Sequence, residues 1–183
     1  MQRTSGLYVL LVHGPVLGPA VGETIVTAVT PLDVTDIARS CRTFGVQGYA
    51  IVQPDPNQQA LARRIQQYWM QRTDGPRSDR ILALERVEVF DSIQSAIAYW
   101  GAGVAVATSA SAGEGTITWN RIKDYASTQP VYLLFGTGYG LTPDTLRQAD
   151  YVAPAIVGSG EFAHLSVRSA VAIILDRIVN AQR

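Results

Sequence analysis

Short apolar runs alternate with segments of mixed polarity along the whole chain. Extended segments are predicted where Val, Ile, Leu and aromatic residues cluster between Gly, Pro or polar residues, at 7–13, 24–29, 48–53, 82–90, 104–108, 131–135 and 151–156. Helices are predicted between most of them, at 33–44, 56–70, 91–101, 118–126, 143–148 and 165–179. Strands that alternate with helices are typical of α/β domains. The pattern therefore predicts one domain over residues 1–183, with a mostly parallel sheet flanked by helices.

Polar residues and glycine mark several helix ends. Asp33 and Asp91 are expected to be N-caps, because a short carboxylate can accept hydrogen bonds from the first turn. Pro56 suits a first helical position, and Gly45 suits the end of a helix.

The last predicted helix is apolar on nearly every side. Its apolar residues are Leu165, Val167, Ala170, Val171, Ala172, Ile173, Ile174, Leu175, Ile178 and Val179. Such a helix needs cover on more than one side. The sheet can cover one side, so the pattern favours a homodimer in which the C-terminal helix is buried against a second copy.

Residues 131–141, VYLLFGTGYGL, break from an apolar run into Gly136, Gly138 and Gly140. Glycine lacks a Cβ and accepts positive φ, so such a loop can bring its backbone close to a ligand. A tight turn after a strand is the alternative interpretation. The loop is a candidate binding element at the end of a buried strand.

Composition limits the class of protein. Apolar residues make up 47% of the 183 residues and charged residues 16%, but no apolar run approaches the ~20 residues that span a bilayer. The N-terminus lacks a convincing signal-peptide cleavage site. A single cysteine, Cys41, and two histidines argue against a disulfide framework and a zinc cluster. A cytoplasmic protein without membrane or metal is expected.

The net charge is zero, but the basic residues are unevenly placed. Between Arg39 and Arg86 there are eight arginines and four acidic residues. Arginine binds phosphate with two parallel hydrogen bonds and stacks on bases, so this stretch could form a nucleic-acid face. An ordinary solvated surface is the alternative.

Familiar catalytic and nucleotide motifs are missing from the sequence. There is no GxxxxGK[ST], no GxSxG, and the late GTGYGL is not the GxGxxG that opens a dinucleotide-binding domain. The acidic residues lack the spacing of a paired-carboxylate or magnesium site. Cys41 lies within a predicted helix and has no histidine near it in sequence, which argues against a catalytic thiol.

Several segments together resemble a bacterial family of SAM-dependent RNA methyltransferases in the SPOUT superfamily. LFGTGYGLT (134–142), YVAPAIVG (151–158) and HLSVRSAVAIILDR (164–177) resemble its C-terminal half. LYVLLVHGPV (7–16) and TAVTPLDVTDIARSCRTFGV (27–46) are similar to its opening segments. The resemblance implies an α/β-knot fold with a C-terminal trefoil knot, and a homodimer that acts on tRNA or rRNA.

The resemblance also implies a pocket for S-adenosyl-L-methionine (SAM), made by three loops at strand ends. The residues it assigns to the cofactor are Thr108, Ser109, Ala110, Phe135, Gly136, Thr137, Gly138, Gly140, Leu141, Ile156, Gly158, His164, Leu165 and Ser166. Leu141, Ile156 and Leu165 could form apolar walls for the adenine. Each of these residues could instead serve only to form a turn. No metal is needed for methyl transfer.

Three residues are candidates for catalysis. Alignment on residues 44–46 places Arg39 at the arginine of the first SpoU motif, where it could stabilise a forming oxyanion, anchor a phosphate or lie on a helix surface. His13 is a candidate general base at the end of the first strand, or a hydrogen-bonded structural residue. Arg168 could orient RNA or the cofactor carboxylate, or bridge a dimer.

Two positions depart from the expected motifs. Thr30 stands where the SpoU motif has Asn, and Phe162-Ala163 stands where Tyr-Asn is expected before HLSVRSA. These departures put substrate handling and activity in question. The alternative function is a catalytically silent SAM- or RNA-binding assembly factor with the same fold, and a nicotinamide-binding oxidoreductase is more distant. With no appended RNA-binding domain in the sequence, RNA would have to contact the dimer itself, through the stretch from Arg39 to Arg86.

Overall fold

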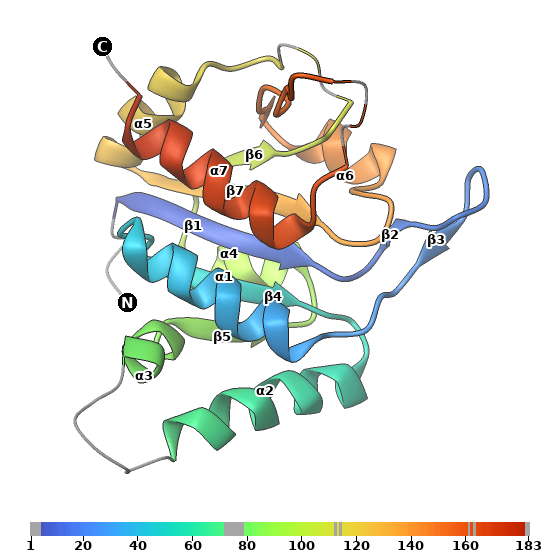
Figure 1. Ribbon diagram of the computed structural model, residues 1–183, viewed down its shortest axis with the longest axis vertical. Coiled ribbons are helices and arrows are strands. Elements are labelled where there is room, and N and C mark those ends of the chain that lie inside the picture. Colours follow the sequence, from blue (N-terminus) through green and yellow to red (C-terminus); the bar gives the residue numbers. More distant parts are fainter. Residues whose placement is uncertain are drawn as a thin grey trace.

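The computed structural model describes residues 5–71, 79–111, 113, 115–160, 162 and 164–181. Six parallel strands form one sheet in the order β5-β4-β1-β7-β6-β8 (Figure 1). Their bounds are β1 Gly6–Val12, β4 Gly48–Val52, β5 Val87–Phe90, β6 Val104–Ala107, β7 Pro130–Gly136 and β8 Tyr151–Val152. The predicted parallel α/β architecture is therefore confirmed.

The two faces of the sheet are covered unequally. One face packs against α1 (Pro31–Thr43), α2 (Pro56–Met70), α3 (Asp79–Leu84), α5 (Trp119–Thr128) and α7 (Val167–Val179). The other face packs against α4 (Ile93–Trp100) and α6 (Pro143–Gln148). Alternate side chains of β1 enter the two layers, because successive residues of a strand point to opposite faces. Both layers are apolar, as a strand buried on both sides requires.

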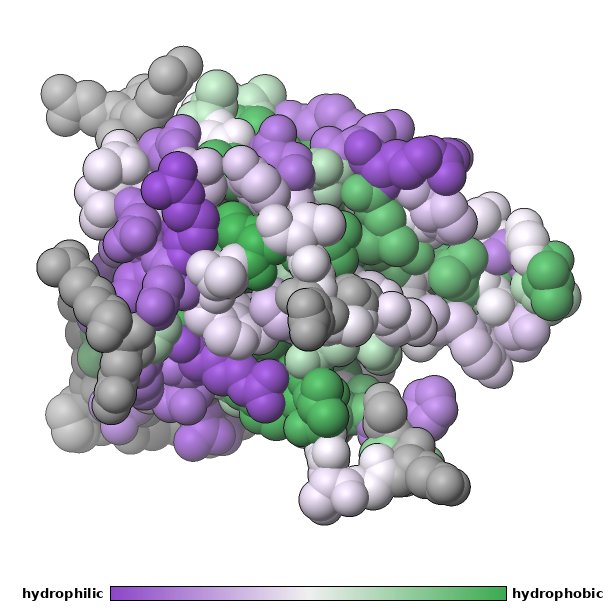
Figure 2. Space-filling view, turned by 90° about the horizontal axis from the view of Figure 1, so that it is seen from above, coloured by the Kyte–Doolittle hydropathy of each residue, from purple (hydrophilic) through white to green (hydrophobic). Residues whose placement is uncertain are grey.

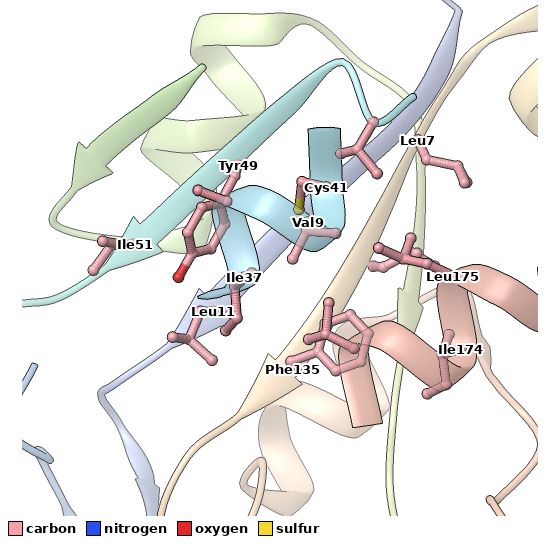
Figure 3. Packing of buried hydrophobic residues seen from close by; sticks show 14 of the residues in the cluster. Leu7, Val9, Leu11, Ile37, Cys41, Tyr49, Ile51, Phe135, Ile174 and Leu175 are labelled. Atoms are coloured by element: carbon pink, nitrogen blue, oxygen red, sulfur yellow. The ribbon is translucent and has the colours of Figure 1, made fainter. Parts of the chain in front are cut away.

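Helices α1 and α7 lie side by side on the centre of the sheet. In Figure 3, Ile37 and Cys41 of α1 and Ile174 and Leu175 of α7 point toward the strands, where Phe135 of β7 meets them. Cys41 is buried, and burial raises the pKa of its thiol. The cysteine is thus a core residue that stays protonated.

Some predicted elements differ from the structure. The segment 82–90 was expected to be extended, but α3 occupies Asp79–Leu84 and only Val87–Phe90 forms a strand. The apolar residues Ala83 and Leu84 fit either element by pattern, and packing of α3 against α1 decides for the helix. The predicted strand 151–156 is reduced to Tyr151–Val152. The segment TDGPRSD (73–79) is predicted to be a polar loop, but Asp79 begins α3 and residues 73–78 lie outside the described residues, as does Arg72.

Two helix caps also differ from the prediction. Thr30, not Asp33, is the N-cap of α1, and the Asp33 side chain accepts a hydrogen bond from the Thr30 backbone in return. Ser92, not Asp91, caps α4. Hydroxyl and carboxylate caps have similar preferences, so the sequence alone does not choose between neighbouring candidates.

The loop after β6 crosses the segment after β8 at close range. The Thr116 N–H donates to the Val152 carbonyl at 2.8 Å, and the Ala155 N–H donates to the Gly113 carbonyl at 2.8 Å. A Cβ on Gly115 would lie 2.6 Å from backbone atoms of residues 152–154. The absence of a side chain at Gly115 makes this close crossing possible, and the trefoil knot itself stays a prediction.

We expect Gly115→Ala to destabilise the protein far more than Gly113→Ala. Both glycines have positive φ, +69° and +60°, but a Cβ on Gly113 would have no heavy atom within 4 Å. The two variants share the backbone strain, so their difference measures the steric clash, which should be about 1–3 kcal/mol of unfolding free energy. Urea unfolding of both variants measures it, and equal losses would contradict the tight crossing.

Candidate functional site

A cleft of about 830 Å³ lies at the carboxyl ends of the central strands. His13 follows β1, Thr108 follows β6, and Thr137 follows β7, so the strand ends place all three at one edge of the sheet (Figure 1). Figure 2 shows that this edge of the molecule is hollowed and that apolar surface reaches it. The carboxyl edge is where open parallel sheets bind ligands, and the volume suits a small molecule.

The structure brings nearly all of the predicted cofactor residues to this cleft. Those that line it are Thr108, Ser109, Ala110, Phe135, Gly136, Thr137, Gly138, Gly140, Leu141, Ile156, His164, Leu165 and Ser166. Gly158 is exposed and is not among the residues lining the cleft. Three segments that are far apart in sequence therefore line one cleft.

The glycine loop is compact and is held by a hairpin that the sequence did not predict. A Cβ on Gly136 would lie 2.4 Å from the Leu141 nitrogen, so the loop folds back on itself closely. Strands β2 (Val16–Leu17) and β3 (Thr24–Ile25) form the antiparallel hairpin. The Leu17 N–H donates to the Gly140 carbonyl at 2.9 Å, and the Tyr139 N–H donates to the Leu17 carbonyl at 3.2 Å. Only part of the predicted extended run 24–29 is strand, because the remainder leads into α1.

His13 lies in the wall of the cleft with no exposed surface. Its Nδ1 is 3.0 Å from Oγ1 of Thr27, and Nε2 has no hydrogen-bond partner among the described residues. Burial lowers the pKa of the imidazole below its ordinary value, and the nearby carboxylate of Asp33 offsets part of this effect. His13 is therefore neutral at neutral pH. Its Nδ1 has a hydrogen-bond partner, whereas its Nε2 has none among the described residues.

Asp33 is a lining residue whose role was predicted only as a cap. It is buried at the first turn of α1, and its Oδ2 accepts from the Thr30 hydroxyl at 2.7 Å. Arg168 of α7 approaches Asp33 Oδ1 at 3.4 Å and Asp36 Oδ2 at 3.8 Å. Arg168 thus joins α7 to α1 at the edge of the cleft, within one chain, and does not line the cleft. The sequence T-x-x-D predicts a capping box, but it does not predict that Asp33 lies at a ligand site.

Arg39 lies outside the cleft of its own chain. It is exposed on the outer side of α1, where it borders a separate shallow hollow with Asp36, Ser40, Thr43 and Phe44. The fold of a single chain therefore does not bring Arg39 to the predicted cofactor residues.

The arginine-rich stretch is partly used for internal contacts. Arg63 donates to the Val89 carbonyl at 3.1 Å, Arg86 donates to the Val46 carbonyl at 2.8 Å, and the Arg80 guanidinium lies 4.0 Å from the Trp69 ring centroid. Arg39, Arg42, Arg63 and Arg64 are exposed, whereas Arg80 and Arg86 are partly buried. Only part of the predicted nucleic-acid face is thus presented to solvent by the described arginines.

Thr27 is the site residue that local sequence signals could least have revealed. Its hydroxyl lies 2.6 Å from that of Thr137, and 110 positions separate the two in sequence.

The departure at Ala163 lies outside the described residues. Within the described part of the chain, no three His, Cys, Asp or Glu side chains gather as metal ligands would. None of the helices in that part has both the length and the apolar character needed to cross a bilayer.

Comparison with known sequences places the chain among relatives. Residues 6–180 match a family described as SAM-dependent RNA methyltransferase. A tRNA (guanine-N(1)-)-methyltransferase of Oleidesulfovibrio alaskensis is 35% identical over 181 residues, which cover 94% of this chain and 42% of the relative. An uncharacterized protein of Aquifex aeolicus is 34% identical over 187 residues, which cover 97% of this chain and 90% of that one. The chain therefore spans less than half of the length of the first relative.

Solved structures share the fold at low sequence identity. A probable methyltransferase from Bordetella pertussis matches 97% of this chain and 94% of its own, with a TM-score of 0.66 and 16% identity. The SpoU methyltransferase AviRb from Streptomyces viridochromogenes, in complex with AdoMet, matches 98% of this chain and 58% of its own, with a TM-score of 0.59 and 20% identity. TrmJ from Z. mobilis has the same TM-score and identity, over 95% of this chain and 68% of its own. The likeness shows that this chain shares the α/β fold of these structures.

We expect the stability of the protein to fall below about pH 6.5 because of His13. The unfolded ring titrates near about 6.5, whereas the folded ring has a lowered pKa. On acidification the unfolded state therefore takes up the proton first, and the free energy of unfolding drops by at most about 1.4 kcal/mol per pH unit until the folded pKa is reached. Urea unfolding across this range measures the slope.

The chain offers a matched control for this slope. His13→Gln should flatten it, whereas replacement of the other histidine, His164→Gln, should leave it in place, because His164 is exposed. A wild-type stability that does not change across this range would contradict the burial of a neutral His13.

Proposed function

The chain belongs to the family of SAM-dependent RNA methyltransferases, and from this premise we propose that it binds SAM in the cleft and methylates an RNA, with tRNA as the substrate class. The family match over residues 6–180 carries this proposal. The choice of tRNA is supported by the tRNA (guanine-N(1)-)-methyltransferase of Oleidesulfovibrio alaskensis, a longer relative of which this chain matches only part.

The composition of the cleft supports SAM as its ligand. The loops at 108–110, 136–141 and 164–166 line it, and its titratable lining residues are His13, Asp33, Tyr139 and His164. Leu141, Ile156 and Leu165 offer apolar contacts for a flat base. The close fold at Gly136 shapes the loop without a side chain. These features suit a ligand with an adenine, ribose hydroxyls and an amino-acid tail.

When bound, SAM supplies an electrophilic methyl group whose transfer leaves the bonding electrons on sulfur. The residues of this chain then have to orient the methyl acceptor, limit water and accommodate the proton that the acceptor loses. His13 is neutral at the working pH and has an uncommitted nitrogen, so we assign proton acceptance to it. Arg168 supports the site indirectly, because it fixes Asp33 at the wall.

Arg39 fits a role in a dimer. Being outside its own cleft, it can serve catalysis only if it meets the RNA at the rim or enters the cleft of a second copy. Helices α1 and α7 contact each other, and Leu32 in α1 and Leu165, which precedes α7, are about half exposed. We propose that two copies pair through these helices and that Arg39 approaches the cleft of the partner.

The single buried Cys41 is in keeping with the cytoplasm as the location.

We expect calorimetry to detect SAM binding and labelled SAM to transfer its methyl group to bulk tRNA in preference to rRNA. Gly136→Ala should abolish both, because its Cβ would meet the Leu141 backbone at 2.4 Å. Gly158→Ala is the matched control and should retain both, since a Cβ there would have no heavy atom closer than 4.0 Å.

The outcomes separate the possible functions. SAM binding without transfer to any RNA would favour the silent assembly factor. No heat with SAM, together with binding of NAD(H), would overturn the methyltransferase proposal in favour of an oxidoreductase.

We expect a mixed dimer of two inactive variants to recover activity. Arg39→Ala should keep SAM binding and lose turnover, whereas Gly136→Ala lacks SAM binding but retains Arg39. In a twofold dimer that pairs one copy of each, one of the two clefts is complete, so random pairing should restore about a quarter of the wild-type rate. Co-expression of the two tagged variants and a methyl-transfer assay measure it. A mixture no more active than the separate variants would contradict the exchange of Arg39.

A further inference from the structure

A series of hydroxyl groups connects His13 to the glycine loop. Nδ1 of His13 is 3.0 Å from Oγ1 of Thr27, which is 2.6 Å from Oγ1 of Thr137, which in turn donates to the Val12 carbonyl at 3.0 Å. Thr27 lies between β3 and α1, and Thr137 directly follows β7. The series therefore ties together three segments that form the cleft wall.

The number of hydroxyl protons determines which group donates and which accepts in each hydrogen bond of this series. Each threonine has one hydroxyl proton, and all three contacts are filled when Thr137 donates to Val12, Thr27 donates to Thr137, and His13 Nδ1–H donates to Thr27. Thr27 could instead donate to the His13 carbonyl, but at 3.3 Å that contact is longer than the other three. In both arrangements Nδ1 carries the ring proton.

The opposite tautomer is unfavourable. If Thr27 donated to Nδ1, the proton of His13 would sit on Nε2, which is buried and has no acceptor among the described residues. A buried N–H without a partner is rarer and more costly than a lone pair without one. The arrangement of hydroxyls therefore leaves Nε2 unprotonated, as a hydrogen-bond acceptor without a donor among the described residues.

We propose that Thr27 is a positioning residue of the site, which together with Thr137 holds His13 in the Nδ1–H tautomer. In this proposal Nε2, which is covered in the structure without ligand, accepts a hydrogen bond or proton from the methylated nucleotide once binding of that nucleotide uncovers it. The catalytic part of this inference rests on the proposed function. The tautomer part stands on the contacts alone. In the transfer, the acceptor atom would gain the methyl group and lose its proton to Nε2, while the sulfonium becomes a neutral thioether, so charge is conserved.

The tautomer can be read directly by nitrogen NMR of the protein labelled with ¹⁵N-histidine. The chain has only two histidines, and His164→Gln identifies the signals of His13. At neutral pH we expect His13 to show a protonated Nδ1 and an unprotonated Nε2. Thr27→Val keeps the shape of the side chain but removes the hydroxyl, so it should shift the ring toward the Nε2–H tautomer. Thr27→Ser is the matched control and should retain the wild-type pattern.

Methyl transfer supplies the second measurement. Thr27→Val should lower the turnover by about tenfold, the loss expected for one hydrogen bond to the reacting group, and Thr27→Ser should restore most of it. Thr137→Val should shift the tautomer in the same direction and provides a second variant if Thr27→Val folds poorly, which unfolding curves reveal.

The outcomes distinguish this inference from the proposed function. An Nε2–H tautomer in the wild type, or a Thr27→Val protein with an unchanged tautomer, would overturn the positioning role whether or not the enzyme is active. A wild-type protein that shows the expected tautomer but methylates no RNA would instead overturn the proposed function. The role of Thr27 and Thr137 in fixing the tautomer of His13 would then still hold.

Discussion

The close approach of backbone to backbone at two glycines is the constraint on which the cleft depends. At Gly115 the chain passes over residues 152–154, and at Gly136 it folds back on Leu141. Neither place has room for a Cβ. The first contact determines how the segment after β8 runs toward α7, and the second shapes the glycine loop. Because both loops border the same cleft, its form is set by backbone packing more than by side-chain chemistry.

Helix α1 shows how one short element can serve several purposes. Its buried side, with Ile37 and Cys41, packs on the sheet. Its first turn brings Asp33 to the cleft, where the Thr30 cap and Arg168 hold the carboxylate. Its outer side presents Arg39 to solvent. A helix turns about 100° per residue, so residues a few positions apart reach the core, the ligand site and the surface.

Much of the architecture could be predicted from the sequence because it depends on local patterns. Buried strands such as β1 and β7 are continuous apolar runs, and the resemblance of three loop segments to a family pointed to residues that the structure gathers in one cleft. The hairpin β2–β3 and the role of Thr27 could not be predicted, because two-residue strands carry no periodicity and the Thr27–Thr137 contact joins residues far apart in sequence. Helix α3 was missed for a related reason, since only its packing on α1 distinguishes it from a strand.

The order of these elements along the chain has a consequence for synthesis of the protein. Residues 164–166 and helix α7 come after every strand of the sheet, yet they line the cleft, and α7 packs against α1. Until they leave the ribosome, the strands and α1 carry an uncovered apolar surface, and the cleft is open on one side. The cleft can therefore reach the form seen in the structure only after α7 has been synthesised.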